Sequence, residues 1–255
     1  MKQGGAALLP PLSLSFARVA FTGRAEGDMG HGGDTVLTPA PGGDQFAAAE
    51  APGRHRIGAI RPGVAARRRA VVDLPWTWLR QVHGAGVVRV EGPGRSAGVT
   101  ADAAVTAQAG CAVAVLTADC APVALASPEG VIGVAHAGWR GVVAGVLEAT
   151  VVEMRVLGAT RIEAVIGPCI RPGCYAFGPD RLDEVAGRLG DGVRATTTAG
   201  EPALDLPAAV REALAIAGVD PGAVADVGTC TACSPDHWSW RAGHERERQA
   251  AVIWR

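Results

Sequence analysis

The stretch that most constrains the fold is residues 110–141, GCAVAVLTADCAPVALASPEGVIGVAHAGWRG. Its apolar runs have the length of strands, and residues 117–120 interrupt them with polar and reactive groups. We expect two apolar strands joined by a tight turn, followed by a glycine-rich corner and a long apolar helix at residues 142–157. The reactive side chains are therefore confined to one end of a hairpin.

The turn of this hairpin predicts its register. Residues 127–130, Ser-Pro-Glu-Gly, fit a three-residue loop that closes with a bulged glycine, so that Ser127 pairs with Val131. Cys120 and His136 then share one face as diagonal neighbours, about 7 to 8 Å apart at the backbone. A two-residue loop would put them on opposite faces of the hairpin. The three-residue loop predicts that these two side chains can share one metal ion.

Composition limits the classes of protein and partner. The chain has 255 residues, 48% of them hydrophobic, and its 24 basic residues nearly balance 25 acidic ones. This is typical of a globular protein and argues against nucleic acid as a partner. The apolar stretches are interrupted before they reach membrane length, and no clear signal-peptide cleavage site follows the N-terminus. We therefore expect a cytoplasmic protein without a membrane partner.

Six cysteines raise the question of disulfides or a structural metal site. A cytoplasmic location favours free thiols over disulfides. Cys230 and Cys233 form a C-x-x-C pair, and Cys169 and Cys174 flank a turn rich in proline and glycine. A structural zinc site usually needs a second ligand pair, and a thioredoxin-like pair should open a helix in a βαβ unit. We therefore interpret these four as loop or buried thiols without chemistry.

Strands and helices mix along the chain without regular βαβ alternation and without a G-x-G-x-x-G motif, which argues against a Rossmann domain. Further strands are expected at residues 15–22, 162–166, 223–227 and 250–254, and helices at residues 64–72, 180–189 and 207–217. Glycine, proline and alanine dominate residues 23–63, which predicts a long loop. We expect residues 1–14 to form a loosely ordered tail and residues 15–255 to form one domain.

Two residues outside the hairpin stand in positions that suit a site. His83 lies where a strand meets a glycine turn, although a structural histidine is the simpler interpretation of this residue alone. Arg140 lies at the start of the predicted helix, where free N–H groups, the helix dipole and the guanidinium suit a phosphate or carboxylate. The alternative there is a plain strand-to-helix corner with an exposed arginine.

A set of short motifs carries a family resemblance. They are QVHG at 81–84, TADC at 117–120, HAGWRG at 136–141, GPCI at 167–170, LDL at 204–206, CTAC at 230–233 and SWR at 239–241. Together they resemble the laccase-domain or polyphenol-oxidase-like family, whose members are also called purine nucleoside phosphorylase and peptidoglycan editing factor. The resemblance runs from about Phe21 to the C-terminus. It implies an α/β (α+β) fold, a single domain with mixed β-sheets sandwiched between helices.

The resemblance also implies a site. The family's zinc ligands match His83, Cys120 and His136, which would form the catalytic centre. Two imidazoles and a thiolate suit zinc, with copper as the alternative, and three protein ligands leave a fourth position open. Similar proteins phosphorolyse adenosine, inosine, guanosine or methylthioadenosine, and deaminate adenosine. The expected partners are a purine nucleoside and inorganic phosphate, bound by a monomer or homodimer.

Three arginines are the expected phosphate ligands, namely Arg24 in FTGR, Arg140 in HAGWRG and Arg241 in SWR. Other pocket segments depart from the family pattern. The usual R-x-G-G-V-S segment reads RAEGDMG at residues 24–30, and Y-E-V-G has become YAFG at residues 175–178. These changes spare the three metal ligands and alter the expected substrate pocket.

Four functions remain open. We favour a zinc-dependent purine nucleoside phosphorylase with adenosine deaminase activity. A hydrolase that edits peptidoglycan precursors would use Cys120 as nucleophile and His136 as base. A copper-dependent polyphenol oxidase is the weakest enzyme hypothesis, because multicopper oxidation needs many more histidines than the six present. The fourth is a non-catalytic protein that a metal ion stabilises.

Overall fold

The computed structural model describes residues 12–30 and 62–255, and within them the apolar runs form two mixed sheets. The first has the order β1-β2-β14-β7-β3-β5, with bounds Leu12–Leu14, Ala17–Phe21, Gln249–Trp254, Ala112–Thr117, Trp76–Arg80 and Val99–Thr100. The second has the order β13-β10-β8-β9-β6-β4, with bounds Val224–Asp226, Glu163–Ile166, Ala121–Ala126, Ile132–Ala137, Ala103–Thr106 and Val87–Arg89. Both sheets contain parallel and antiparallel pairs.

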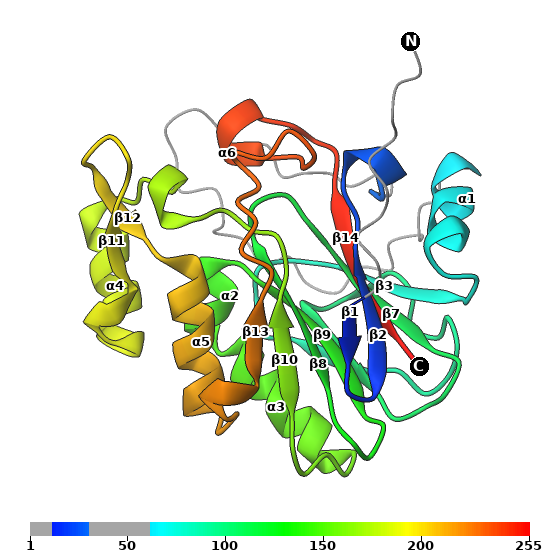
Figure 1. Cartoon of the computed structure of the whole chain (residues 1–255). Coiled ribbons are helices and arrows are strands. Elements are labelled where there is room, and N and C mark those ends of the chain that lie inside the picture. The colour runs from blue at the N-terminus through cyan, green and yellow to red at the C-terminus, as the bar shows by residue number, and fades with distance from the viewer. Residues whose placement is uncertain (1–11, 31–61) are drawn as a thin grey trace.

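The two sheets pack face to face between helices (Figure 1). Successive side chains of β7 point to opposite faces of the first sheet. Val113 and Val115 pack between the two sheets, whereas Ala114 and Leu116 lie on the outer face of the first sheet. That side is covered by α1 (Pro62–Val71), and the outer face of the second sheet is covered by α2 (Trp139–Ala144), α3 (Val146–Val156), α4 (Pro179–Leu189) and α5 (Leu206–Ile216). The expected single-domain architecture of mixed sheets between helices is confirmed.

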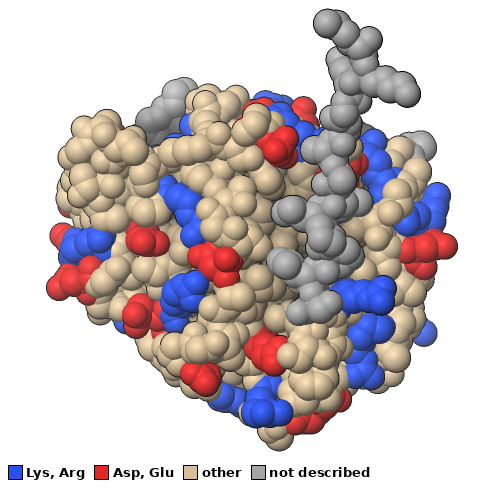
Figure 2. Space-filling view, viewed as in Figure 1, with Lys and Arg blue, Asp and Glu red and all other residues tan. Residues whose placement is uncertain are grey.

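Short elements complete the described chain. They are the 3-10 helices η1 (Arg24–Glu26), η2 (Pro172–Cys174), η3 (Asp191–Val193) and η4 (Pro221–Ala223), the hairpin of β11 (Arg194–Thr196) and β12 (Pro202–Leu204), and α6 (Trp240–Gly243). None of the helices in the described ranges has the length and apolar character that a membrane span requires. Acidic and basic side chains are interspersed over the face in Figure 2, without an extended surface of one sign.

The turn at residues 127–130 has the register that its sequence predicts. The N–H of Ser127 donates to the carbonyl of Val131 at 2.9 Å, and the N–H of Gly130 donates to the carbonyl of Ser127 at 2.9 Å. Gly130 has a φ of 82°, a left-handed conformation that glycine adopts without strain. The three-residue loop between β8 and β9 is therefore confirmed, and His136 lies opposite Pro122.

Three expected segments differ from the structure. The first strand of the hairpin is two strands, β7 and β8, which belong to different sheets because the chain turns at Asp119, whose φ is 90°. The long helix at residues 142–157 is divided into α2 and α3, because Gly145 takes a φ of 89° and its N–H turns back to the carbonyl of Val142. Strand β1 lies inside the segment expected to be a tail. Residues 1–11, and residues 31–61 of the predicted loop, lie outside the described chain.

The strand directions bring distant segments to one end of the sandwich. β2, β7 and β3 run parallel within the first sheet, and β9, β10 and β13 share one direction in the second. The turn between β7 and β8 joins the sheets at the ends of β7 and β9. α6 covers this end, which is uppermost in Figure 1. Loops after six strands therefore meet there, and they carry most of the motifs singled out in the sequence.

Candidate metal centre

Three side chains from separate segments converge where β3, β7 and β9 end. His83 follows β3, Cys120 directly precedes β8, and His136 lies within β9. Their ligand atoms all lie within 4.8 Å of one another, and the sulfur of Cys120 is 3.7 Å from Nε2 of His83. The two imidazole rings meet edge to face, with centroids 4.7 Å apart. The structure thus brings together the three residues expected to bind metal.

The geometry of this cluster fits a metal ion. A tetrahedral zinc ion with bonds of about 2.3 Å to sulfur and about 2.0 Å to nitrogen holds those two atoms about 3.5 Å apart. The measured separation between Cys120 Sγ and His83 Nε2 is 3.7 Å. Two nitrogens and one sulfur form a borderline-soft donor set that both zinc and copper accept. The cluster can therefore bind a metal ion and leaves a fourth coordination position for water or substrate.

Gly138 closes the cluster from the side of α2. A Cβ atom at this position would lie 2.8 Å from the sulfur of Cys120 and 3.0 Å from Cδ2 of His83. The contact with the sulfur is shorter than real Cβ atoms make, so any larger residue would force the two ligands to shift. The glycine corner of HAGWRG is therefore required by the cluster, and the next two residues, Trp139 and Arg140, begin α2 beside it.

Asp102, which the sequence did not single out, orients two of the three ligands. Its fully buried carboxylate is 2.9 Å from Nδ1 of His136. A carboxylate only accepts, so Nδ1 carries the proton and Nε2 of His136 is left for a metal ion. The same carboxylate accepts the backbone N–H groups of His83 at 2.9 Å and Gly84 at 2.8 Å. The sequence does offer one signal for Asp102, because an acidic residue stands there between two alanines, directly before the buried strand β6.

Gln81 fixes the start of the loop that carries His83. Its side-chain amide donates to the carbonyl of Leu116 at 2.7 Å, and its side-chain oxygen accepts the N–H of Leu116 at 2.8 Å. The side chain thus extends the pairing of β3 with β7 beyond the last strand residue. Two hydrogen bonds to one backbone position hold the QVHG loop in register with the strand that leads to Cys120.

The electrostatics of the cluster favour a charged sulfur. Burial raises the pKa of Cys120, but His136 and His83 outweigh it and bring that pKa well below its usual range. Burial lowers the pKa of His136, and Cys120 and Asp102 reverse this effect and raise it. The side chains alone therefore favour a thiolate beside an imidazolium. The thiolate is the form of cysteine that binds metals and attacks electrophiles.

Asp119 fixes the turn before Cys120 in a conformation that is unusual for a residue with a side chain. Its φ is 90°, and its carboxylate accepts the hydroxyl of Thr231 and the backbone N–H of Arg241, both at 2.7 Å. Its own carbonyl accepts the N–H of Ile170 at 2.9 Å. These bonds stabilise the strained backbone and join the Cys120 turn to the loops after β10 and β13.

Arg140 and Arg241 flank a wall of aromatic side chains. The guanidinium of Arg140 stacks on the Trp139 ring at 4.5 Å, and that of Arg241 lies 4.9 Å from the centroid of Tyr175. Phe177 fills the space between, with centroids 5.4 Å from Trp139 and 5.2 Å from Tyr175. Two cationic groups therefore lie at the two ends of one aromatic row.

This wall adjoins the metal-binding cluster. Burial and the nearby charge of Cys120 raise the pKa of the Tyr175 hydroxyl, whereas Arg241 and Arg140 lower it. Trp139 and Arg140 directly follow Gly138, which lies against Cys120 and His83. Arg241 is also tied to the turn before Cys120, since its N–H bonds to Asp119.

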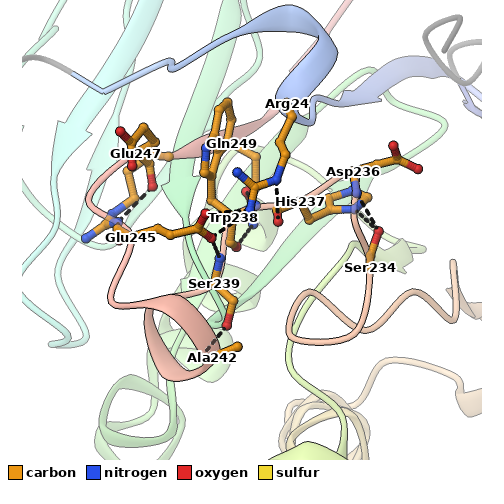
Figure 3. A network of polar contacts seen from close by, with 11 residues as sticks. Arg24, Ser234, Asp236, His237, Trp238, Ser239, Ala242, Glu245, Glu247 and Gln249 are labelled. Carbon is orange, nitrogen blue, oxygen red and sulfur yellow. Dashed lines mark hydrogen bonds and ion pairs between the residues drawn. The ribbon is translucent and has the colours of Figure 1, made fainter.

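Arg24 has a different environment from the other two arginines (Figure 3). Its guanidinium contacts both carboxylate oxygens of Glu245, at 2.5 and 2.8 Å, and donates to the carbonyl of His237 at 3.1 Å. Glu245 also accepts the N–H of Ser239 at 2.8 Å, beside the start of α6. Arg24 therefore holds the segment around α6 through Nε and Nη2 of its guanidinium group.

The chain is similar to a family and to several named proteins. Residues 60–255 match the family model described as multi-copper polyphenol oxidoreductase laccase. "Purine nucleoside phosphorylase ORF3" of Streptomyces griseus is 43% identical over 195 residues, covering 74% of this chain and 78% of that protein. "Purine nucleoside phosphorylase" of Xylella fastidiosa is 39% identical over 185 residues, covering 69% and 71%.

Solved structures share the fold. YlmD from Geobacillus stearothermophilus has a TM-score of 0.75 at 26% identity, over 100% of this chain and 98% of that one. The hypothetical protein YfiH of Bacillus licheniformis has a TM-score of 0.68 at 26% identity, over 75% and 80% of the two chains. The similarity therefore covers the sandwich and the segments that carry the metal-binding cluster.

Proposed function

The chain belongs to the multi-copper polyphenol oxidoreductase laccase family, and from that premise we propose that it is a zinc-dependent purine nucleoside phosphorylase. The observation that carries the proposal is the pair of guanidinium groups, Arg140 and Arg241, at the two ends of an aromatic row that adjoins the metal-binding cluster through Gly138 and Asp119. Such an arrangement offers cations to a phosphate, and the partly exposed ring of Trp139 offers a flat apolar surface to a purine. Relatives named purine nucleoside phosphorylase support the same reaction.

In phosphorolysis a phosphate oxygen bonds to C1′ of the ribose while the bond from C1′ to the base nitrogen breaks, and the base leaves with the electron pair and takes up a proton. Arg140 and Arg241 bind the phosphate and hold its charge near the sugar. Because α2 has only six residues, the guanidinium of Arg140 rather than the helix dipole supplies the positive charge there. Trp139, which is partly exposed at the end of the aromatic row, stacks on the base.

His83, Cys120 and His136 would hold the ion, and Asp102 keeps Nε2 of His136 directed at it. When bound, the ion supplies Lewis-acid chemistry at the open fourth position. We infer zinc, because one cluster of two histidines and a cysteine with an open position is a catalytic zinc arrangement. Copper oxidation as the family name describes it requires several copper centres, and the chain has six histidines in all. Adenosine deamination is the second reaction that we propose for the same ion.

A cysteine hydrolase is the second candidate, favoured by one observation. The pKa of Cys120 is lowered and that of His136 is raised, as in a nucleophile and base pair. In the absence of metal the thiolate could attack a carbonyl of a peptidoglycan precursor, expel the amine and form a thioester that water hydrolyses. Zinc would inhibit that reaction by occupying the sulfur, whereas it should activate phosphorolysis. The response to zinc therefore separates the two functions.

The test is an assay with metal-quantified protein and adenosine or inosine, with and without inorganic phosphate, followed by chromatography. We expect free base and ribose 1-phosphate only when both zinc and phosphate are present. Arg140→Gln and Arg241→Gln should raise the KM for phosphate about tenfold, the loss of one charge-assisted contact. Arg188→Gln, which removes a surface pair with Glu148 on α3, is the matched control. Zinc-loaded protein that releases no base would overturn the proposal.

A further inference from the structure

A second group of metal-ligating side chains lies in the loops after β10 and β13. The sulfur atoms of Cys174, Cys230 and Cys233 all lie within 4.8 Å of one another, and those of Cys174 and Cys233 are 2.8 Å apart. All three cysteines are free thiols, and none belongs to the His83–Cys120–His136 cluster. The C-x-x-C pair therefore has a third thiol beside it, supplied by a segment 56 residues earlier in the chain.

The backbone holds these two loops together. Cys169 and Cys230 form an isolated parallel bridge, in which the N–H of Thr231 donates to the carbonyl of Cys169 at 3.1 Å. On the other side, the N–H of Ser234 donates to the carbonyl of Cys230 at 3.0 Å and closes the turn between Cys230 and Cys233. Backbone hydrogen bonds therefore fix the positions of both cysteines of the C-x-x-C pair.

The flanking residues are fixed as well. Arg171, just before η2, makes a two-fold contact with Asp226 of β13, one arm of it at 2.8 Å. After Cys233, the hydroxyl of Ser234 contacts Nδ1 of His237 at 2.9 Å and accepts the N–H of Asp236 at 3.2 Å (Figure 3). Both loops are therefore anchored on either side of the sulfur atoms.

Three sulfurs at this spacing suit a soft metal ion. Thiolates around one tetrahedral zinc ion, with bonds of about 2.3 Å, lie about 3.8 Å apart. Cys174 and Cys230 are partly buried and Cys233 is exposed, so an ion can enter from solvent and keep a fourth ligand there. The exposed Cys233 side chain would rotate outward by about 1 Å to reach that spacing. A disulfide between two of the sulfurs is the competing chemistry, and it leaves the third without a function.

We propose that Cys174, Cys230 and Cys233 bind one thiophilic metal ion, separate from the ion of the first cluster, and that this ion clamps together the loops after β10 and β13. Binding releases the thiol protons and forms three metal–sulfur bonds. Those loops contact the turn that precedes Cys120, because Thr231 and Ile170 both bond to Asp119. The ion therefore supports one wall of the first site without contacting substrate, and this role does not depend on which reaction that site performs.

The experiment is metal analysis of the full chain, purified anaerobically with reductant, saturated with zinc and freed of excess zinc by gel filtration. We expect two zinc ions per chain in the wild type and one in Cys233→Ser or Cys174→Ser. Cys111→Ala, which alters a thiol buried in the core between the sheets, should keep both ions. One ion per chain in the wild type, lost in Cys120→Ala and kept in Cys233→Ser, would overturn the proposal.

A second measurement requires no variant and remains decisive if a substitution prevents folding. The wild-type protein is alkylated with iodoacetamide with and without zinc, and the modified cysteines are identified by peptide mass spectrometry. Zinc should protect Cys174, Cys230 and Cys233 together, in addition to Cys120. Protection of Cys120 alone, or a disulfide between Cys174 and Cys233 in the zinc-treated reduced protein, would refute a metal site in these loops.

Discussion

The two clusters of metal-ligating side chains each have three members whose ligand atoms lie within 4.8 Å of one another, but they are built differently. His83, Cys120 and His136 lie at the ends of strands from both sheets, with a buried carboxylate behind the imidazole of His136 and Gly138 against the ligands. Cys174, Cys230 and Cys233 lie in two surface loops that backbone hydrogen bonds join. The first is mixed in donor type and supported by dedicated side chains, as a reactive centre requires. The second is all sulfur, and its loops are joined by backbone hydrogen bonds and flanked by side-chain pairs, which suits a structural ion.

The largest effect should come from removing the one sulfur of the first cluster. Cys120→Ala takes away the soft ligand and leaves His83 and His136 alone, so the first ion and nearly all phosphorolysis should be lost, at least about 100-fold. Metal analysis and the nucleoside assay on the same sample measure both effects. The ion of the three-cysteine cluster should remain. If the variant keeps both ions, Cys120 is not a ligand.

Adding one methyl group at Gly138 tests how closely the first cluster is packed. In Gly138→Ala the new Cβ would lie 2.8 Å from the sulfur of Cys120 and 3.0 Å from His83, so the ligands must move apart. The backbone itself is not strained, because the φ of Gly138 is −72°. We expect zinc affinity to fall about tenfold or more by competition with a chromophoric chelator.

The control for this change is Gly187→Ala in α4. No atom lies within 4 Å of a Cβ at Gly187, so alanine has space there. It should leave zinc affinity unchanged and stabilise the helix by up to about 1 kcal/mol, because alanine has the higher helix propensity. Equal zinc affinity in the two variants would show that Gly138 does not limit the spacing of the ligands.

Asp102→Asn tests how much the orientation of His136 contributes to metal binding, because all three ligands remain in this variant. The amide keeps the shape of the side chain but loses the negative charge that holds the Nδ1 proton of His136 and the N–H groups of the His83 loop. We expect zinc affinity and kcat to fall between about 10- and 100-fold, the usual cost of losing such a partner. Isothermal titration with zinc and steady-state kinetics check the two losses. An unchanged zinc affinity would mean that Asp102 serves only the backbone of the loop.

The sequence predicts features that depend on neighbours along the chain. The turn at residues 127–130 sets its own register through proline and glycine, so the pairing of β8 with β9 and the common face of Cys120 and His136 followed from local chemistry. The apolar pattern does not predict the break of the helix at Gly145, because apolar residues continue on both sides of it, although glycine itself is a signal for a break. Motif resemblance added His83, which the periodicity of its own segment did not identify.

Features that depend on contacts between distant segments were not predictable from one sequence. Asp119 meets Thr231 across 112 positions, and Cys174 meets Cys233 across 59. Nothing in the C-x-x-C pair shows that the loop after β10 folds over it, so the sequence alone does not place Cys174 beside the pair. Asp102 was overlooked for the same reason, since its partner His136 is 34 positions away. Local patterns thus predict strands and turns, whereas the supports of a site appear only after the sheets pair.

The smallest effect is expected from the ion pair between Arg171 and Asp226, which flanks the three-cysteine cluster. Asp226→Asn removes the partner of Arg171, a partly buried pair, and should lower the free energy of unfolding by about 1 kcal/mol at neutral pH. Burial raises the pKa of Asp226, but the Arg171 guanidinium and the N–H of Gly228 outweigh it and lower that pKa below its usual value. The stabilisation is therefore complete above the ordinary aspartate pKa and disappears as the pH falls through the lowered one. Urea unfolding of both proteins at neutral and acidic pH should show a difference that vanishes in acid. A difference that persists in acid would assign the loss to packing rather than to charge.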